Sequence, residues 1–176
     1  MLALAEAARD GRIKGARVAL VISDQPDAPG LAAAAALGLP TQVIEKKGRK
    51  RAAHDAETLA ALRARGVEWV CLAGYMRLLS PVFIDAYRGR VVNIHPSLLP
   101  AFPGLHAQRQ ALAYGVKITG CTVHFVDEGL DTGPIIAQRA VSVLPDDTET
   151  TLAARILAQE HQLYIEALAR IIGAEA

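Results

Sequence analysis

The sequence has few of the features that mark secreted or membrane proteins. It contains only two cysteines in 176 residues, Cys71 and Cys121. Both lie in apolar runs, where a free thiol behaves as a small buried hydrophobe, and a disulfide between them is the alternative. No apolar run approaches the roughly 20 residues that cross a bilayer, and the N-terminal residues carry Glu6 but no basic region, unlike a signal peptide. We therefore expect a cytoplasmic protein that does not bind membranes.

A strong excess of either charge is also missing. The formal net charge is +1, so binding to nucleic acid would require a local basic patch. The one basic run, residues 46–51, has no interleaved aromatic residues of the kind that stack on bases. A solvated loop is the first interpretation of this run, contact with an anionic ligand is the second, and nucleic acid is not expected as a partner.

Apolar segments are abundant, and their lengths alternate between those of strands and helices. Strand-length apolar runs occupy residues 18–22, 69–73 and 91–94, and segments of helical composition lie between them at 30–37 and 55–65. This alternation predicts an α/β fold with a Rossmann-like, mostly parallel sheet flanked by helices. We expect the three runs to form the centre of the sheet, because strands covered on both faces are apolar throughout. The length favours one domain, residues 1–176.

The second half of the chain predicts a different arrangement. Residues 118–126 and 135–143 alternate in polarity like strands of mixed orientation, and a long helix is expected at about 148–172. The chain opens on a predicted helix, residues 2–8, whereas doubly wound sheets usually begin with a strand near their centre.

The segment that predicts chemistry is residues 90–104. Side chains alternate between the faces of a strand, so Asn93 and His95 should share one face at the carboxyl end of a buried strand. An amide and an imidazole held side by side can both donate hydrogen bonds to a developing oxyanion, and the imidazole can carry a proton. The alternative is that Asn93 caps a turn and His95 is a core histidine. The prolines that follow favour an ordered loop of the kind that supports a site.

A second segment, residues 122–134, runs from a strand into an acidic loop that contains glycine. It can present Asp127, Glu128 and Asp131 at the edge of the sheet. A carboxylate from this loop could reach His95 and favour its protonated form, which is the better proton donor and oxyanion partner. An ordinary Asp-Gly turn with solvated acids remains an equal alternative.

Two other kinds of catalytic site are not favoured. The histidines His95, His106 and His124 have none of the short paired spacings of zinc ligands, so no metal is expected. Ser97 is not part of a Gly-x-Ser-x-Gly motif, which argues against a serine hydrolase.

Together the two segments resemble the folate-dependent formyltransferases that use 10-formyltetrahydrofolate. The resemblance is carried by Asn-Ile-His-Pro-Ser-Leu-Leu-Pro at 93–100, by Phe-Pro-Gly at 102–104, and by residues 72–81, 124–134 and 159–161. These details resemble most the branch that acts on glycinamide ribonucleotide in purine biosynthesis. The resemblance implies the formyltransferase fold, small-molecule substrates and no metal. It leaves open a related enzyme acting on another amine, and it leaves both a monomer and a homodimer open.

The resemblance also implies roles for individual residues. It implies that Asn93 and His95 stabilise the tetrahedral intermediate and that Asp131 assists His95 in moving the proton. It further implies that the formyl donor is bound by Arg51 from the basic run, by the strand residue Asn93, and by two loops: Met76, Arg77, Leu78 and Leu79 in one, and Asp127, Glu128, Gly129, Leu130 and Asp131 in the other. Simple core packing is the alternative for residues 76–79.

Glu160 interrupts the apolar stripe of the last predicted helix. Leu152, Ile156, Leu163 and Ala167 occupy the other positions of that stripe, so a carboxylate falls where helical spacing calls for a hydrophobe. The resemblance implies that Glu160 binds the ribose hydroxyls of the substrate. A boundary residue that reaches solvent is the alternative.

The start of the chain departs from the family pattern. The family begins with a buried strand and a glycine-rich loop whose N–H groups bind the substrate phosphate, and residues 1–8 align with the helix that follows them. We therefore expect a domain that is short at its N-terminus and lacks the first strand and the phosphate loop. An inactive folate-binding remnant is accordingly a second reading of function.

Overall fold

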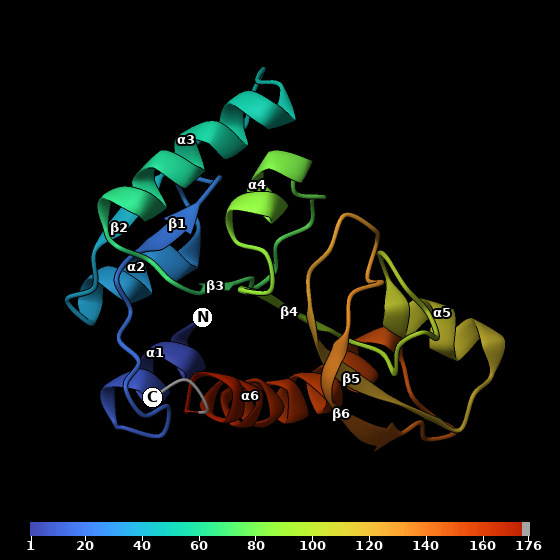
Figure 1. Cartoon of the computed structure of the whole chain (residues 1–176). Helices are drawn as coiled ribbons and strands as arrows, with labels where there is room; N and C mark the ends of the chain where they lie inside the picture. The colour runs from blue at the N-terminus through green and yellow to red at the C-terminus, as the bar shows by residue number, and fades with distance from the viewer. Residues whose placement is uncertain (174–176) are drawn as a thin grey trace.

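The structure is a computed structural model that describes residues 1–173, and its helices and strands alternate along most of the chain (Figure 1). The helices are α1 (Leu2–Arg9), α2 (Pro29–Ala36), α3 (Arg51–Ala64), α4 (Pro81–Ala86), α5 (Ala107–Tyr114) and α6 (Glu149–Gly173). The strands are β1 (Val21–Ser23), β2 (Thr41–Val43), β3 (Val70–Cys71), β4 (Val91–His95), β5 (Ile118–Phe125) and β6 (Ile135–Ser142).

The strands form two sheets. β1 and β2 pair in parallel, and a second sheet has the order β3-β4-β5-β6. In that sheet β3 and β4 are parallel, whereas β4-β5 and β5-β6 are antiparallel. The predicted α/β class, with parallel pairs flanked by helices, is confirmed, and so is the mixed orientation of the later strands.

The expected position of the first apolar run is wrong in one respect. Residues 18–22 were expected at the centre of the sheet, but β1 has β2 as its one partner among residues 1–173, and β3 likewise pairs with β4 alone. The apolar character of this region comes instead from side-chain packing, because Ile22 packs against a core cluster that also contacts Val70 and Leu72. Periodicity reports burial of side chains and does not report how many strands are hydrogen-bonded alongside.

The long helix α6 covers β5 and β6 and supplies six of the twelve buried residues of one core cluster. Its residues Leu152 and Ile156 are fully buried and pack in one cluster with Val92 and Val123 of the sheet. The hydroxyl of Tyr164 lies 2.8 Å from the carbonyl oxygen of Val92 and 3.0 Å from that of Leu72. This helix therefore holds the backbone just after β3 and near the start of β4, one residue before Asn93. None of the helices in residues 1–173 is both long and apolar enough to cross a membrane.

A second core cluster lies on the other side of β3 and β4. It joins Leu59 and Leu62 of α3 to Phe83 and Ile84 of α4 and to Val91 of β4. The two cysteines are free thiols, with Cys121 buried as expected, while Cys71 on the edge strand β3 is exposed.

Candidate functional site

The candidate site is built on the register between β4 and β5. Asn93 pairs with His124 and His95 pairs with Thr122 across the two strands, so these side chains project from one face of the sheet. His95 and His124 are both almost fully buried. Two imidazoles and an amide are therefore held close together by rigid backbone.

Asp131 completes this group from the loop after β5. Its Oδ2 lies 3.4 Å from Nδ1 of His95 and accepts a hydrogen bond of 2.8 Å from the N–H of Gly104. The backbone of Asp131 is left-handed, with φ 55°, a conformation that aspartate tolerates better than most residues. One carboxylate thus joins the β5–β6 loop to β4 and to the loop that follows it.

The remaining nitrogen of His95 contacts its own loop. Nε2 donates a hydrogen bond of 2.9 Å to the carbonyl oxygen of Phe102. Phe102 also has a left-handed backbone, with φ 54°, which turns the chain back toward β4. Both nitrogens of His95 are consequently held in place, one beside a carboxylate and the other on a carbonyl.

His124 orients the amide of Asn93. Its Nδ1 lies 2.8 Å from the carbonyl oxygen of Phe125, so this nitrogen carries the proton. Nε2 is then free to accept from Nδ2 of Asn93, at 3.3 Å, and it lies 3.8 Å from Oδ1 of Asp131. Burial lowers the pKa of His124, which favours the neutral ring that this arrangement requires. Asn93 therefore has one N–H on His124 and a second that points elsewhere.

The four side chains Asn93, His95, His124 and Asp131 are called the catalytic cluster, after the role that is proposed for them below. The structure brings together the three residues expected from the sequence and adds His124, for which the sequence predicted no catalytic role. The alternation of residues 122–125 already places His124 on the same face of its strand as Thr122. That this face also carries Asn93 and His95 follows only from the register of the two strands. Within residues 1–173, His, Cys, Asp and Glu side chains do not gather in threes in a geometry that could hold a metal ion.

Residues 76–79 lie between β3 and α4 and differ among themselves in burial. Met76 and Leu78 are 73% and 44% exposed, while Leu79 is buried in the second core cluster. Core packing therefore accounts for Leu79 but not for its neighbours. One guanidinium nitrogen of Arg77, Nη1, is buried and has no hydrogen-bond partner among residues 1–173.

A buried carboxylate anchors the end of this stretch. Asp55 of α3 accepts a hydrogen bond of 2.7 Å from the N–H of Ser80, and the hydroxyl of Ser80 caps α4 by accepting from Phe83 N–H. Nδ1 of His54 lies 3.5 Å from Oδ1 of Asp55, and Nε2 of His54 lies 2.9 Å from the carbonyl oxygen of Ile44. The sequence pattern did not predict that His54 and Asp55 support this stretch, because helical periodicity alone does not distinguish a buried polar pair from a solvated one.

The loop of residues 127–131 is braced internally. Oδ1 of Asp127 accepts from the N–H of Gly129, at 3.0 Å, and from the hydroxyl of Thr132, at 2.8 Å. Glu128 and Leu130 are exposed. The residue before the loop, Val126, packs against the same core cluster as Leu79, so this loop and residues 76–79 both adjoin that cluster.

Arg51 is the first residue of α3 and is exposed. Two other members of the basic run form ion pairs. Nζ of Lys46 lies 3.0 Å from Oδ2 of Asp24, and Nη2 of Arg49 lies 2.6 Å from Oε2 of Glu57. Much of the run is therefore a solvated, ion-paired surface, which was the first interpretation.

Glu160 faces a cavity of about 210 Å³. The cavity is also lined by Gly74 after β3, by Ile94 of β4 and by Tyr164 one turn further along α6. Burial raises the pKa of Glu160. Because Ile94 lies between Asn93 and His95 in the chain, this cavity lies on the opposite face of β4 from the catalytic cluster.

Comparison with known proteins places this architecture in a family. The sequence profile of the family described as "Formyl transferase" matches residues 1–168. The chain is 51% identical over 177 residues to the "Trifunctional purine biosynthetic protein adenosine-3" of Drosophila melanogaster, which covers 99% of this chain and 13% of that protein. It is 45% identical over 159 residues to the "Phosphoribosylglycinamide formyltransferase" of Bacillus subtilis, covering 90% of this chain and 82% of the relative.

A solved structure supports the same assignment. The glycinamide ribonucleotide transformylase 1 of Symbiobacterium toebii superposes with a TM-score of 0.95 at 52% identity, covering 98% of this chain and 81% of that one. The chain thus spans a small part of the insect protein and about four fifths of the two bacterial ones. On both sequence and structure, the chain belongs to the formyl transferase family.

Proposed function

We propose that this chain transfers the formyl group of 10-formyltetrahydrofolate to the amino group of glycinamide ribonucleotide, a step of purine biosynthesis. The names of the B. subtilis relative and of the S. toebii structure support this substrate. The observation that carries the chemistry is the contact of 3.4 Å between His95 and Asp131, with Asn93 oriented beside them by His124.

The cluster suits an acyl transfer through a tetrahedral intermediate. The substrate amine attacks the formyl carbon, a new C–N bond forms, and the carbonyl oxygen becomes an oxyanion. The free N–H of Asn93 and the imidazole of His95 donate to that oxyanion. As the bond to N10 of the folate breaks, the proton lost by the amine passes through His95 to N10, and the negative charge of Asp131 favours the protonated ring during this transfer.

One rearrangement follows from the observed geometry. Nε2 of His95 donates to the carbonyl oxygen of Phe102, so its contact with an oxyanion requires that this hydrogen bond be exchanged. The loop of residues 96–104 would accordingly shift slightly when the reaction begins.

The binding roles are proposals of the same kind. The exposed Met76 and Leu78, the buried nitrogen of Arg77 and the neighbouring loop of residues 127–131 are suited to hold the pterin. Arg51 would meet the anionic tail of the folate. Glu160 would bind the ribose hydroxyls of a ribonucleotide that passes over the carboxyl end of β4, from its cavity on one face to the catalytic cluster on the other. A homodimer stays a prediction.

Substitution of the central pair tests the proposal. We expect His95→Ala and Asp131→Asn each to lower the rate of formyl transfer by about 10²- to 10⁴-fold, the usual contribution of a positioned acid or base. His106→Asn is the matched control, because His106 is a histidine with 61% of its side chain exposed whose left-handed backbone suits asparagine. Near-normal rates in both cluster variants would reject the assignment.

A competition assay separates the proposed substrate from other amines. If glycinamide ribonucleotide is the acceptor, a tenfold excess of an unrelated sugar nucleotide should leave its formylation unchanged. Equal competition would favour a related formyltransferase with another acceptor. Calorimetry with a folate analogue alone and with the ribonucleotide alone identifies a remnant without turnover, which would bind only the folate.

A further inference from the structure

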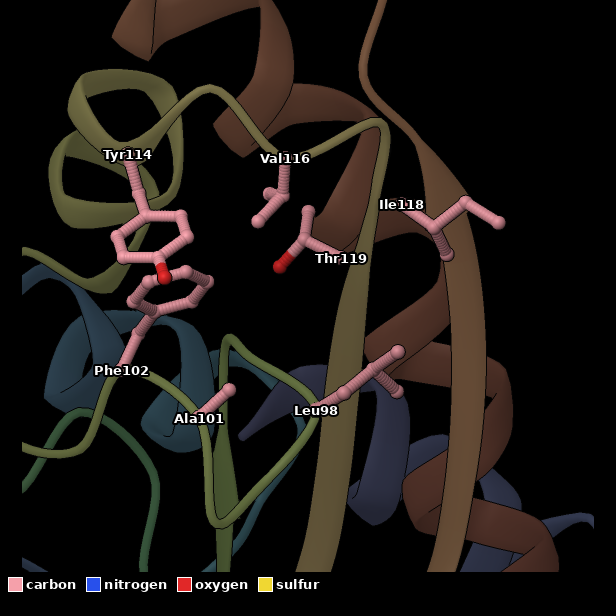
Figure 2. Close-up of a pocket in the computed structure, with 7 residues that line it drawn as sticks. All are labelled: Leu98, Ala101, Phe102, Tyr114, Val116, Ile118 and Thr119. Atoms are coloured by element: carbon pink, nitrogen blue, oxygen red, sulfur yellow. The ribbon is translucent and has the colours of Figure 1, made fainter.

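A second cavity lies behind the loop that follows β4, away from Glu160. Its volume is about 430 Å³, within the range of small-molecule sites. Leu98, Ala101 and Phe102 of the loop form one wall, and Val116 and Thr119 form the other (Figure 2). We call it the loop cavity.

The loop cavity contains one polar group that has no hydrogen-bond partner in residues 1–173. The hydroxyl of Thr119 points into the cavity in Figure 2. Thr119 is only 2% exposed, and its Oγ1 has no hydrogen-bond partner among the described residues. A buried hydroxyl without a partner lowers the stability of the fold, and valine would fill the same space without this cost. The hydroxyl therefore points to a ligand that can pair with it.

The rest of the lining defines the chemistry of that ligand. Phe102 and Tyr114 meet edge to face with ring centroids 5.9 Å apart, an arrangement that offers an aromatic wall. None of the lining residues, all of them in the described chain, carries a charge. Burying a phosphate or carboxylate here would cost far more than the contacts return, so the charged substrates of the proposed reaction do not fit this cavity.

The wall of the loop cavity is connected to the catalytic cluster. The side chain of Phe102 lines the cavity, while its carbonyl oxygen accepts from Nε2 of His95 at 2.9 Å. The residue before Phe102 is also held by a hydrogen bond: the hydroxyl of Ser97 donates to the carbonyl oxygen of Ala101, at 2.5 Å. A molecule that pushes on Phe102 would therefore change the hydrogen bond that His95 makes.

We propose that the loop cavity is a second, regulatory binding site for a neutral, mostly apolar small molecule with one hydroxyl group. The hydroxyl pairs with Thr119, the apolar body lies against Phe102 and Tyr114, and occupancy alters the bond between Phe102 and His95. The site differs in place and in chemistry from the proposed folate and ribonucleotide sites.

Binding of phenol, with toluene as the matched probe without a hydroxyl, tests the site. In an NMR titration of the whole chain we expect phenol to saturate in the millimolar range and toluene to bind several-fold more weakly. Thr119→Val should weaken phenol by about three- to tenfold, the value of one hydrogen bond, and leave toluene unchanged. Thr119→Ser keeps the hydroxyl and should keep the preference for phenol. Equal affinity for both probes in the unsubstituted chain would overturn the proposal.

A cavity-filling variant locates the binding. Val116→Phe should abolish the binding of both probes, because Val116 is partly buried in the wall opposite Phe102. If both probes still bind this variant as tightly, they bind elsewhere and the proposal fails. A sedimentation measurement adds a further check: a dimer that phenol dissociates would show that a second copy covers the cavity, which also contradicts the proposal.

The connection to His95 has a readout that does not depend on activity. Saturating phenol should shift the ¹⁵N resonance of His95 Nε2 in the unsubstituted chain and should leave it unchanged in Val116→Phe. An unshifted resonance in the phenol-saturated chain would overturn the regulatory part of the proposal, whether or not formyl transfer is observed.

Discussion

The catalytic cluster and residues 76–79 lie at neighbouring strand ends but are built differently. In the cluster, each polar side chain has a partner in the chain: Asn93 has His124, and His95 has both Asp131 and Phe102. In the other stretch Met76 and Leu78 are exposed, and Nη1 of Arg77 has no hydrogen-bond partner among residues 1–173. Groups proposed for chemistry are thus fixed in advance, whereas groups proposed for binding retain unused contact surface.

The physical reason lies in how each function is stabilised. Transition-state stabilisation depends on dipoles that are already oriented, because reorienting them during the reaction costs free energy. Binding residues gain their contacts only with a ligand, so they can sit on a loop whose end alone is anchored, here by Asp55 and Ser80. Each prediction below tests one side of this comparison.

Among the substitutions that compare these two regions, the largest effect is expected from Asn93→Ala. Removing one oriented donor from an oxyanion site typically lowers kcat by about 10²- to 10³-fold, and we expect the KM for the folate to change little. Steady-state kinetics with both substrates measures the split. A change confined to KM would show that Asn93 binds rather than catalyses, and would remove the distinction between the two regions.

Arg77→Met should produce the opposite split. It removes the guanidinium but keeps an apolar stem of similar length, so we expect the KM for the folate to rise about tenfold, the value of one charge-assisted hydrogen bond, with kcat unchanged. Arg88→Met is the control, since Arg88 is an exposed arginine just after the end of α4 that pairs with Asp85. An effect on kcat as large as that of Asn93→Ala would contradict the comparison.

Glu160→Gln should weaken binding of the ribonucleotide and should stabilise the folded chain. Burial raises the pKa of Glu160 above its ordinary value of 4.5, so the charged form costs stability at neutral pH. We expect the free energy of unfolding at pH 7 to rise by on the order of 1 kcal/mol, while the KM for the ribonucleotide also rises. The gain should disappear as the pH falls below about 4.5, where the carboxyl is neutral in both states.

Denaturant titrations at pH 7 and pH 4 measure this difference. Glu6→Gln is the control, because Glu6 is exposed on α1 and its replacement should have little effect at either pH. A loss of stability in Glu160→Gln at pH 7 would mean that the carboxylate has a stabilising partner.

The smallest effect is expected at His124. Its pKa is lowered from 6.5 by burial, so the unfolded chain takes up a proton at this residue before the folded chain does. Its contribution to stability is therefore complete above pH 6.5 and is lost as the pH falls below that value. Relative to the unsubstituted chain, His124→Gln should flatten this acid dependence by less than about 1 kcal/mol at pH 6. Parallel pH profiles of the two proteins would contradict a neutral, amide-orienting His124.

Much of the architecture was predictable because its signals are local. The apolar stripe of α6 and the apolar run of β4 both reflect one-dimensional periodicity, and the structure has both elements within a residue or two of the predicted bounds. The shared face of Asn93 and His95 follows from the same alternation. The position of β1 was not predictable in this way, because the number of neighbouring strands depends on residues distant in the chain.

The sequence by itself determined the α/β class, the strand that carries Asn93 and His95, and the polar break at Glu160, since each depends on spacing along the chain. From spacing alone Asp127, Glu128 and Asp131 were all candidates to contact His95; the family resemblance favoured Asp131, and the tertiary structure shows that contact. Only the tertiary structure decided that His124 orients Asn93 and that Thr119 lies in a cavity with no hydrogen-bond partner among residues 1–173. Those facts depend on strand register and on left-handed turns at Phe102 and Asp131. A shift of one residue in either would send the same side chains to other partners.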